Sequence, residues 1–541
     1  MMSFRRSLTA VVLALAAAPA LFAQQFTRIP ASQFVKDPAK VKALQDAVTA
    51  MKSRSTANPM SADFRTSWAY WSATHGYLGT GKHAATTAAN FKTVVAPQRC
   101  AGAVPKNVCL HYYNHVTDSV VPNDGFTDDI WGTCQHSPRG SINMQFLPWH
   151  RMYLIFFERI LRKASGDPQF ALPYWDYYNE LGPKHGVAVP ALVRGTSTGS
   201  LYDEFRTPGL NTNATSIDPK LASAEQAFKA PSFTSFSQQL EQQPHGLMHC
   251  GTGFNCAAPD MGIVPVAGLD PVFYMHHANI DRLWQCWMLQ KAKGQPITLQ
   301  WAKDNLGQPD SWFNQTWQFV DENGKEVTMA VKDLFAPGVV DYTYANFNDC
   351  GQGPPPVAEF AAAETAIAAA PAPPPPSALT APAAPAAVGK PTRLHGRVMS
   401  VHPQRQTAKL LSATAMAMPP GAEFPSGRTL LILDDVTFEA PPGVTYDVYI
   451  APRKTPSRRA YVATLNLFGV FDEHDHAAAA KPGFDHLFWD ITNQLARLAL
   501  TPTSDIDVTF VPSNGMQGAH VTEANAAGAV MVGNVRIQQV P

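Results

Sequence analysis

The sequence predicts two folded units, a mainly helical domain followed by a β-sandwich. Three observations support this division. Apolar residues recur at helical spacing before about residue 350. Residues 351–390 are mostly alanine and proline, a composition that cannot bury a core and favours an extended linker. Short runs of β-branched and aromatic residues, separated by proline and glycine turns, follow the linker. We therefore expect a helical domain at 24–350, a linker at 351–390 and a β-sandwich at 391–541.

The individual elements follow from local patterns. Val41, Leu44, Val48 and Met51 share one face of a predicted helix, and a second helical pattern extends over 153–161. Loops rich in Pro, Gly and Asn separate such patterns. The predicted strands behind the linker are Thr429–Leu433, Tyr446–Ile450, Tyr461–Leu467, Asp507–Val511 and Val530–Ile537.

Composition excludes several classes of protein. The chain has 541 residues with 42 basic and 42 acidic side chains, and only 16% of its residues are charged. Without net charge or runs of Lys or Arg, it lacks the positive surface of proteins that bind nucleic acid or anionic membranes. The length provides enough core that neither disulfides nor metals are needed merely to fold. Seven cysteines leave at least one thiol without an intramolecular disulfide partner.

Residues 1–23 have the layout of a cleaved signal peptide. Arg5 and Arg6 precede an apolar run from Leu8 to about Leu15, and small residues end the segment at Ala23. The paired arginines loosely resemble a twin-arginine signal, so the general and twin-arginine export routes both stay open. No other segment approaches the ~18 apolar residues of a membrane-spanning helix. We expect an exported protein, periplasmic or secreted, with no membrane span.

Histidine clusters point to metal chemistry. His245 and His249 are four residues apart, so on a helix both imidazoles lie on one face and can bind the same ion. Such a pair also arises by chance and alone does not define a site. His276 and His277 form a second cluster. Adjacent helical residues point about 100° apart, so only one of these two should face a metal squarely.

The surroundings of these histidines resemble a known family. Residues 270–284, which read DPVFYMHHANIDRLW, resemble the second copper-binding signature of the superfamily of tyrosinases, catechol oxidases and hemocyanins. Residues 146–154, FLPWHRMYL, followed by FER at 157–159, resemble its first signature. The resemblance implies a core of four antiparallel helices. It also implies a dinuclear type 3 copper centre, with three histidines on each ion and O2 as co-substrate.

The resemblance assigns the second copper ion to His245, His249 and His277. His276 then lies on the pocket wall, either as a catalytic residue that meets substrate or as a packed polar residue. Asp281 is expected to orient the helix or its imidazole, or else to pair with an arginine. Zinc is the main alternative metal, but the sequence has no His-Glu-x-x-His motif and no carboxylate at a ligand spacing.

The first copper ion is assigned by resemblance to His75, His136 and His150. His75 ends a predicted helix and precedes a glycine suited to a helix end. Its rival is His115, whose distance from His136 along the chain matches the family better. Cys134 and His136 match the Cys-x-His of fungal tyrosinases and molluscan hemocyanins, which implies a thioether bond between them. A free or disulfide-bonded Cys134 is the alternative.

Three further positions tune the reaction in the family. Glu241 stands where a glutamate holds a water near the site and supports proton removal. Gly246 stands where an asparagine assists in the strongest monophenolases, and Val264 stands where many plant enzymes place a bulky phenylalanine over copper. Gly246 therefore disfavours the hydroxylation of monophenols and Val264 favours it. We expect a tyrosinase with strong catechol oxidase activity.

The predicted C-terminal domain, called the rear domain below, also resembles a domain of this superfamily. YDVY at 446–449 is similar to the Phe-Asp-Val-Tyr segment in the β domain of plant and some bacterial polyphenol oxidases, which covers the copper site. YTY at 342–344 resembles the Tyr-x-Tyr that closes the catalytic core. We expect a shielding domain, with a secretion or oligomerisation module as the alternative. Phe468, Phe471 and Phe488 are candidates for a plug, and residues 474–476, HDH, are either a copper-loading site or an exposed loop.

The predicted function is copper-dependent oxidation of phenols by O2. The enzyme would o-hydroxylate monophenols and oxidise o-diphenols to o-quinones, and it would stay latent until the rear domain is displaced. A catechol oxidase without monophenolase activity and a hemocyanin-like oxygen carrier are the alternatives. Small phenols are the expected partners, and the oligomeric state, a homo-oligomer included, stays open. In an oxidising compartment Cys250 could pair with Cys256 and Cys100 with Cys109, whereas Cys286 and Cys350 are left open.

Overall fold

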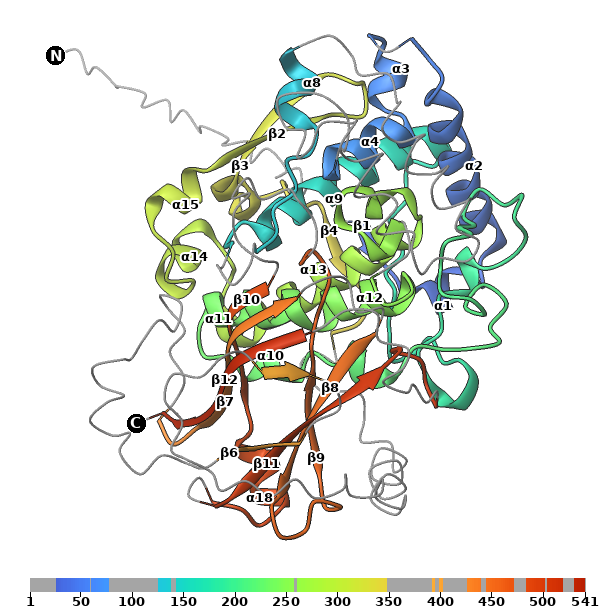
Figure 1. The fold of residues 1–541 in the computed structure, drawn as a ribbon. Coiled ribbons are helices and arrows are strands. Elements are labelled where there is room, and N and C mark those ends of the chain that lie inside the picture. Colours follow the sequence, from blue (N-terminus) through green and yellow to red (C-terminus); the bar gives the residue numbers. More distant parts are fainter. Residues whose placement is uncertain are drawn as a thin grey trace, which may run out of the picture.

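The computed structural model describes residues 26–58, 60–76, 125–137, 143–256, 260–347, 392–394, 398–401, 426–438, 444–470, 483–501, 504–518 and 530–540. They form a helical domain and a β-sandwich, as the sequence predicts (Figure 1). The following predicted features lie outside the described residues: the signal peptide, the linker, His115, Cys100, Cys109, Cys350, Phe471 and residues 474–476.

The helical domain is built on two long helices that pack against each other, α9 (Phe146–Ser165) and α13 (Val272–Ala292). The predicted helix through Val41 is α2 (Pro38–Arg54), which begins after Asp37, a side chain that accepts two backbone N–H groups. The shorter helices are α1 (Ala31–Phe34), α3 (Ala62–Arg65), α4 (Trp68–His75), α8 (Gly125–Ile130), α10 (Glu225–Lys229), α11 (Phe233–Leu240), α12 (Leu247–Thr252), α14 (Leu299–Asn305) and α15 (Asp310–Asn314).

Tighter and wider helical turns connect these elements. A π-helical segment, η6 (Glu241–Gly246), joins α11 to α12. The 3-10 turns are η3 (Pro183–His185), η4 (Ala191–Val193), η5 (Pro219–Ala222), η7 (Asp260–Gly262), η8 (Val264–Leu269) and η9 (Val331–Phe335).

Two small sheets close the helical domain. Strand β1 (Phe26–Arg28) pairs in parallel with β4 (Tyr342–Tyr344), and β2 (Thr316–Val320) pairs antiparallel with β3 (Glu326–Ala330). Asp281 on α13 accepts hydrogen bonds from the hydroxyl groups of Tyr342 and Tyr344, each at 2.6 Å, and from the Arg151 guanidinium on α9. Arg28 of β1 joins this buried cluster by donating to the Tyr344 hydroxyl and to Glu158 on α9, so both ends of the domain are tied to its two central helices. Of the two expected roles of Asp281, the structure therefore shows pairing with arginine.

The sandwich consists of two four-stranded sheets, ordered β10-β7-β12-β5 and β6-β11-β8-β9. Its strands are β5 (Thr392–Leu394), β6 (Val398–Val401), β7 (Thr429–Phe438), β8 (Thr445–Pro452), β9 (Ala460–Thr464), β10 (Gly483–Asp490), β11 (Ile506–Ser513) and β12 (Val530–Gln539), with one helix, α18 (Thr492–Arg497). All five predicted strands are present. The third ends at Thr464, so its predicted extension to Leu467 is wrong, because the chain there leaves the sheet toward the helical domain.

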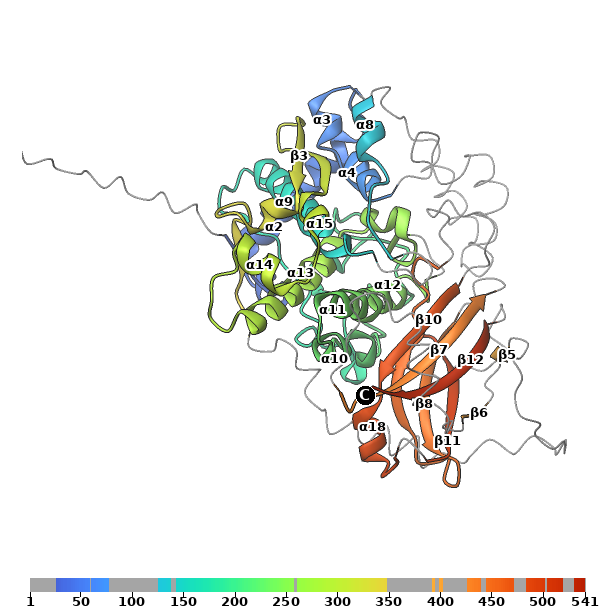
Figure 2. The same ribbon diagram turned by 90° about the vertical axis from the view of Figure 1, so that its left-hand side faces the viewer.

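The sandwich packs against α10, α11 and α12 (Figures 1 and 2). Lys220 of the helical domain and Asp447 of β8 form a largely buried ion pair, with 2.7 Å between Nζ and Oδ2. Backbone hydrogen bonds join residue 218 to residue 515 and residue 517 to residue 216. The Gln239 side chain on α11 donates to the Phe488 carbonyl. Charged, polar and backbone groups of both domains therefore meet at one interface.

Candidate metal centre

The first histidine group is assembled from three separate elements. His75 is the last residue of α4, Cys134 and His136 lie on the loop after α8, and His150 lies in the second turn of α9. The ligand atoms of these four residues all lie within 4.8 Å of one another. Gly76 allows this because a Cβ there would be 2.1 Å from the Pro265 Cα. Gly76 follows the last residue of α4, as expected, and its extended φ of −154° and missing side chain allow the close approach of η8.

The second group comes from η6, α12 and α13. The ligand atoms of His245, His249, His276 and His277 also lie within 4.8 Å of one another. The Nε2 atoms of His249 and His277 are 3.4 Å apart. The two groups adjoin, because the rings of His277 and His150 stack with centroids 4.3 Å apart and an interplanar angle of 8°.

Backbone carbonyls orient three of the imidazoles. The Nδ1–H groups of His150, His245 and His249 are placed to donate to the carbonyls of Phe146, Glu241 and Met261, at 2.8, 3.1 and 2.8 Å. A hydrogen bond at one ring nitrogen fixes the tautomer that leaves the other nitrogen free to bind a metal. The Nε2 atoms of these three rings are therefore the available donors.

Burial disfavours the charged form of five of these imidazoles. Burial lowers the pKa of His150, His245, His249 and His277 well below the ordinary histidine value, and neighbouring imidazoles lower it further. Burial lowers the pKa of His276 to about 3. At neutral pH all five rings are uncharged, which is the form of histidine that binds metal ions.

Buried nitrogens without hydrogen bonds show that a metal fits here. Among the described residues, Nε2 of His136, His245 and His276 and Nδ1 of His277 are buried without a hydrogen-bond partner. Leaving such atoms unpaired costs about 1–3 kcal/mol each. The donors in both groups are imidazoles and one thiol, without a carboxylate. This set suits copper better than Mg²⁺, Ca²⁺ or Mn²⁺.

A helical core that brings two groups of buried histidines face to face defines a protein with a dinuclear metal centre. Residues 65–206 and 198–290 match the family model described as the common central domain of tyrosinase. This part of the chain is therefore similar to the central domain of the tyrosinase family of type 3 copper proteins. Members of this family use a dinuclear copper site, and the two histidine groups provide positions for two ions.

Two relatives are similar to this chain in sequence, and one solved structure is similar to it in fold. The chain is 31% identical over 328 residues to tyrosinase HcTyr1 of Hahella sp. (strain CCB-MM4), across 55% of this chain and 59% of that protein. It is 31% identical over 252 residues to the latent form of a chloroplastic polyphenol oxidase of Prunus armeniaca, across 40% of this chain and 38% of that protein. It thus spans less than two thirds of either relative. A latent aurone synthase structure shares the fold, with a TM-score of 0.55 and 19% identity over 96% of this chain and 90% of that one.

The structure places the remaining predicted residues around the histidines. The Tyr177 hydroxyl is 2.6 Å from Nδ1 of His276, a contact that holds this buried ring in place. Val264 is buried at the start of η8, facing Gly469 of the rear domain. Gly246 follows His245 in η6, and a Cβ there would lie 2.1 Å from the amide nitrogen of Asn466.

Glu241 is held by the loop of the first histidine group. Its carboxylate accepts the Ser137 N–H at 2.6 Å and the Ser137 hydroxyl at 2.5 Å. One of its oxygens also lies 3.4 Å from Nδ1 of His136. Glu241 thus connects the segment that carries His245 to the loop that carries His136. Sequence reasoning missed Ser137 and Tyr177, because nothing local marks contacts across about a hundred residues.

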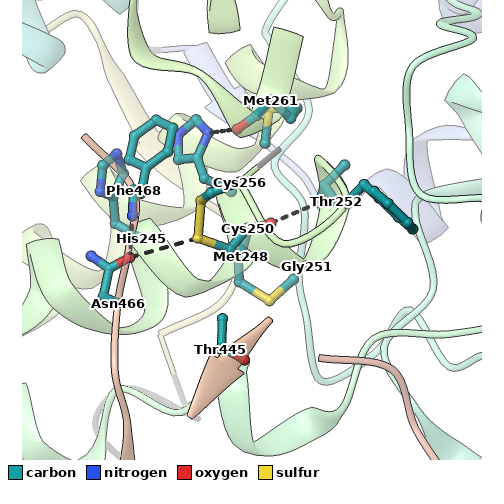
Figure 3. The surroundings of a disulfide bond; sticks show 12 residues. His245, Met248, Cys250, Gly251, Thr252, Cys256, Met261, Thr445, Asn466 and Phe468 are labelled. Carbon is teal, nitrogen blue, oxygen red and sulfur yellow. Dashed lines mark hydrogen bonds between the residues drawn. A yellow bond between two sulfur atoms is a disulfide. The ribbon is translucent and has the colours of Figure 1, made fainter. Parts of the chain in front are cut away.

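A phenylalanine of the rear domain enters the site. The ring of Phe468 stacks on the His249 imidazole, with centroids 3.9 Å apart and an interplanar angle of 12°. It also lies against His245 and His136, at 5.5 and 5.9 Å. Figure 3 shows this ring beside His245. Phe488, the other described plug candidate, packs against Leu430 and Ile432 and lines a small cavity together with Gln238 and Gln239 of α11.

A disulfide stands next to this contact. Cys250 and Cys256 are bonded, which confirms the pairing suggested by their short separation (Figure 3). Cys250 follows His249 directly, and its sulfur lies 3.8 Å from the side-chain oxygen of Asn466. Cys286 is also disulfide-bonded, whereas Cys134 forms no disulfide. No helix in the described part of the chain combines the length and apolar character needed to cross a bilayer.

Proposed function

We propose that the protein is a copper-dependent phenol oxidase that converts o-diphenols to o-quinones and o-hydroxylates monophenols, with O2 as the oxidant. The observation that carries this proposal is the pair of adjoining histidine groups with an aromatic ring stacked on His249. A phenol ring placed like that of Phe468 would lie against histidines of both groups. Relatives named tyrosinase and polyphenol oxidase support the same activity.

The ligand assignment is part of the proposal. His75, His136 and His150 would hold one ion, and His245, His249 and His277 the other. His277 is preferred to its neighbour because it stacks on His150 between the two groups, whereas Tyr177 anchors His276. His75 is preferred to His115 because it lies within the first group. We further propose the thioether between Cys134 and His136, which is supported by the gathering of this sulfur with the imidazoles.

When bound, the copper pair supplies the redox chemistry between O2 and the phenol. The protein contributes neutral imidazoles, a dry pocket and a fixed orientation for the ring. We propose that Glu241 acts by positioning His136 through Ser137 and by placing negative charge beside the site. His276, anchored by Tyr177, would form the wall of the pocket against which the substrate ring packs.

Latency is the second part of the proposal. The sandwich at 391–541 would shield the helical domain at 24–350, joined to it by the linker at 351–390. Phe468 occupies the place proposed for the substrate ring, and Lys220 with Asp447 fastens the sandwich beside it. Displacement of the sandwich would admit substrate. Residues 1–23 support export to the periplasm or medium.

A catechol oxidase is the second candidate, and Gly246 is the observation that favours it. A glycine brings no side chain that could assist removal of a proton from a monophenol. The test is the copper-loaded full chain, assayed with tyrosine and with a catechol before and after proteolysis in the linker. Quinone from both substrates supports a tyrosinase, and quinone from the catechol alone supports a catechol oxidase. No quinone from either, with two copper ions bound, would refute the enzyme and favour an oxygen carrier. Equal rates before and after cleavage would refute latency.

A further inference from the structure

Phe468 lies within a continuous segment of the rear domain. The residues before and after it in the sequence also contact the helical domain. Asn466 donates from its side-chain amide to the Gln242 side chain at 3.3 Å. The Asn466 side-chain oxygen accepts the Phe468 N–H at 3.0 Å, which closes a tight local turn. Gly469 then passes Val264, with φ of +78°. The surface of the helical domain next to the histidines therefore has room for the polypeptide on both sides of the aromatic residue.

Gly246 makes room for the asparagine. The Asn466 amide occupies the volume that any side chain at position 246 would fill, since a Cβ there would be 2.1 Å from its nitrogen. Figure 3 shows Asn466 beside the Cys250–Cys256 disulfide and close to Phe468 and His245. The helical domain thus has a polar notch, lined by Gln242, Gly246 and Cys250, next to the place of the aromatic ring.

Phe468 differs from a tyrosine by one hydroxyl group. It has the ring of a phenolic substrate without the oxygen at which the proposed reaction begins. The segment from Asn466 to Gly469 therefore has the properties of an unreactive analogue of a tyrosyl peptide. Its contacts show which features of a polypeptide the helical domain can recognise at this site. These are an aromatic ring, a carboxamide two residues before it and a glycine after it.

We propose that the uncovered site acts on tyrosyl or dopa residues within exposed polypeptide segments, preferring an asparagine two positions earlier and a following glycine. This inference rests on the proposed phenol oxidase function and narrows its substrate class. In the reaction, one peptidyl tyrosine and one O2 give one peptidyl o-quinone and one water. The residue gains one oxygen atom and loses two hydrogen atoms, and the four electrons that reduce O2 come from the phenol.

The first test makes the covering segment itself the substrate. Full-length, copper-loaded Phe468→Tyr is incubated in air, and its peptides are analysed by mass spectrometry. We expect residue 468 to gain one oxygen and lose two hydrogens, or to appear as its reduced dopa form. Phe510→Tyr is the matched control, because this side chain packs in the core between the two sheets, and it should remain unmodified.

The second test supplies the segment in trans to the full-length Lys220→Glu chain, in which repulsion from Asp447 opens the interface. The probes are a blocked heptapeptide of residues 464–470 with tyrosine in place of Phe468, its counterpart with alanine in place of Asn466, and N-acetyltyrosine amide. We expect kcat/KM of the first probe to exceed that of each of the others by about tenfold. For an enzyme restricted to catechols, dopa replaces tyrosine in all three.

A binding measurement is independent of activity. The labelled heptapeptide that retains phenylalanine should bind metal-free Lys220→Glu, measured by fluorescence anisotropy, with a Kd about tenfold lower than the alanine counterpart. Equal kcat/KM and equal Kd for all probes would overturn the inference while leaving the proposed function standing. Absence of quinone from every probe and from a small catechol would instead refute the proposed function.

Discussion

The ion pair between Lys220 and Asp447 gives the sharpest test of how the sandwich is held over the histidines. Both side chains are largely buried, with exposed fractions of 17% and 5%. The carboxylates of Asp447 and Asp218 raise the pKa of Lys220 well above its ordinary value, although burial opposes its charge. Lys220→Ala leaves the Asp447 carboxylate buried without its cation in the covered state, while water solvates this carboxylate in the uncovered state.

The magnitude follows from the cost of an uncompensated buried charge. Removing one partner of a buried pair costs about 3–5 kcal/mol. The Thr464 hydroxyl still donates to Asp447, at 2.6 Å, so the lower end applies. About 3 kcal/mol corresponds to a roughly hundredfold change in the ratio of covered to uncovered protein. We expect quinone production without proteolysis to rise by up to this factor, limited by the rate of the fully opened enzyme.

The assay follows quinone absorbance for copper-loaded wild type, Lys220→Ala and Lys229→Ala. Lys229 forms an ion pair with Glu225 within α10, so its loss should leave latency unchanged. Copper content and circular dichroism verify that each chain is loaded and folded. A folded, copper-loaded Lys220→Ala chain that stays as latent as wild type would refute the role given to this interface.

Three further predictions address other parts of the molecule. Gly246→Ala should raise the activity of the uncleaved protein about tenfold in the same assay. The reason is that the new Cβ displaces the Asn466 amide from its hydrogen bonds to Gln242 and to the Phe468 N–H. Unchanged latency would contradict the close fit of the Asn466 amide against Gly246. Cys134 should resist alkylation in copper-matured, reduced and denatured protein, and should be alkylated in protein never exposed to copper; alkylation in both would exclude the thioether. Burial raises the pKa of Glu180 to about 7 from 4.5, so its stabilisation is present below pH 4.5 and is lost as pH rises through 7. Glu180→Gln should therefore remove a decline of about 3 kcal/mol in the free energy of unfolding between pH 5 and 9, measured with denaturant, and an unchanged slope would contradict the shift.

Much of the fold follows from local patterns. The helix through Val41 and the helix through Tyr153 were predictable because their apolar residues recur at helical spacing. Strand β10 was not predicted, because His486 interrupts its apolar pattern and pairs with Asp434 on the neighbouring strand β7. The pairing of β1 with β4 was also beyond local reasoning, since more than 300 residues separate the two strands.

Some residues of the candidate site were also predictable from the sequence, and others were not. The signature segments contain His150 and His277, and the four-residue spacing of His245 and His249 predicts that these two imidazoles lie together. The sequence could not single out Phe468 among the three candidate phenylalanines. The local pattern of an apolar residue near a strand is the same whether its side chain packs in the sandwich core or contacts another domain. Ser137 and Tyr177 contact Glu241 and His276 only through the tertiary fold, so their roles required the structure.

The central claim is that two adjoining histidine groups bind a pair of copper ions. Metal analysis of purified full-length protein after copper loading, in wild type and in His277→Ala, tests it most directly. We predict two copper ions per chain for wild type and at most one for His277→Ala, with loss of quinone formation by the variant. One copper ion or none per wild-type chain, or two in both proteins, would contradict the account.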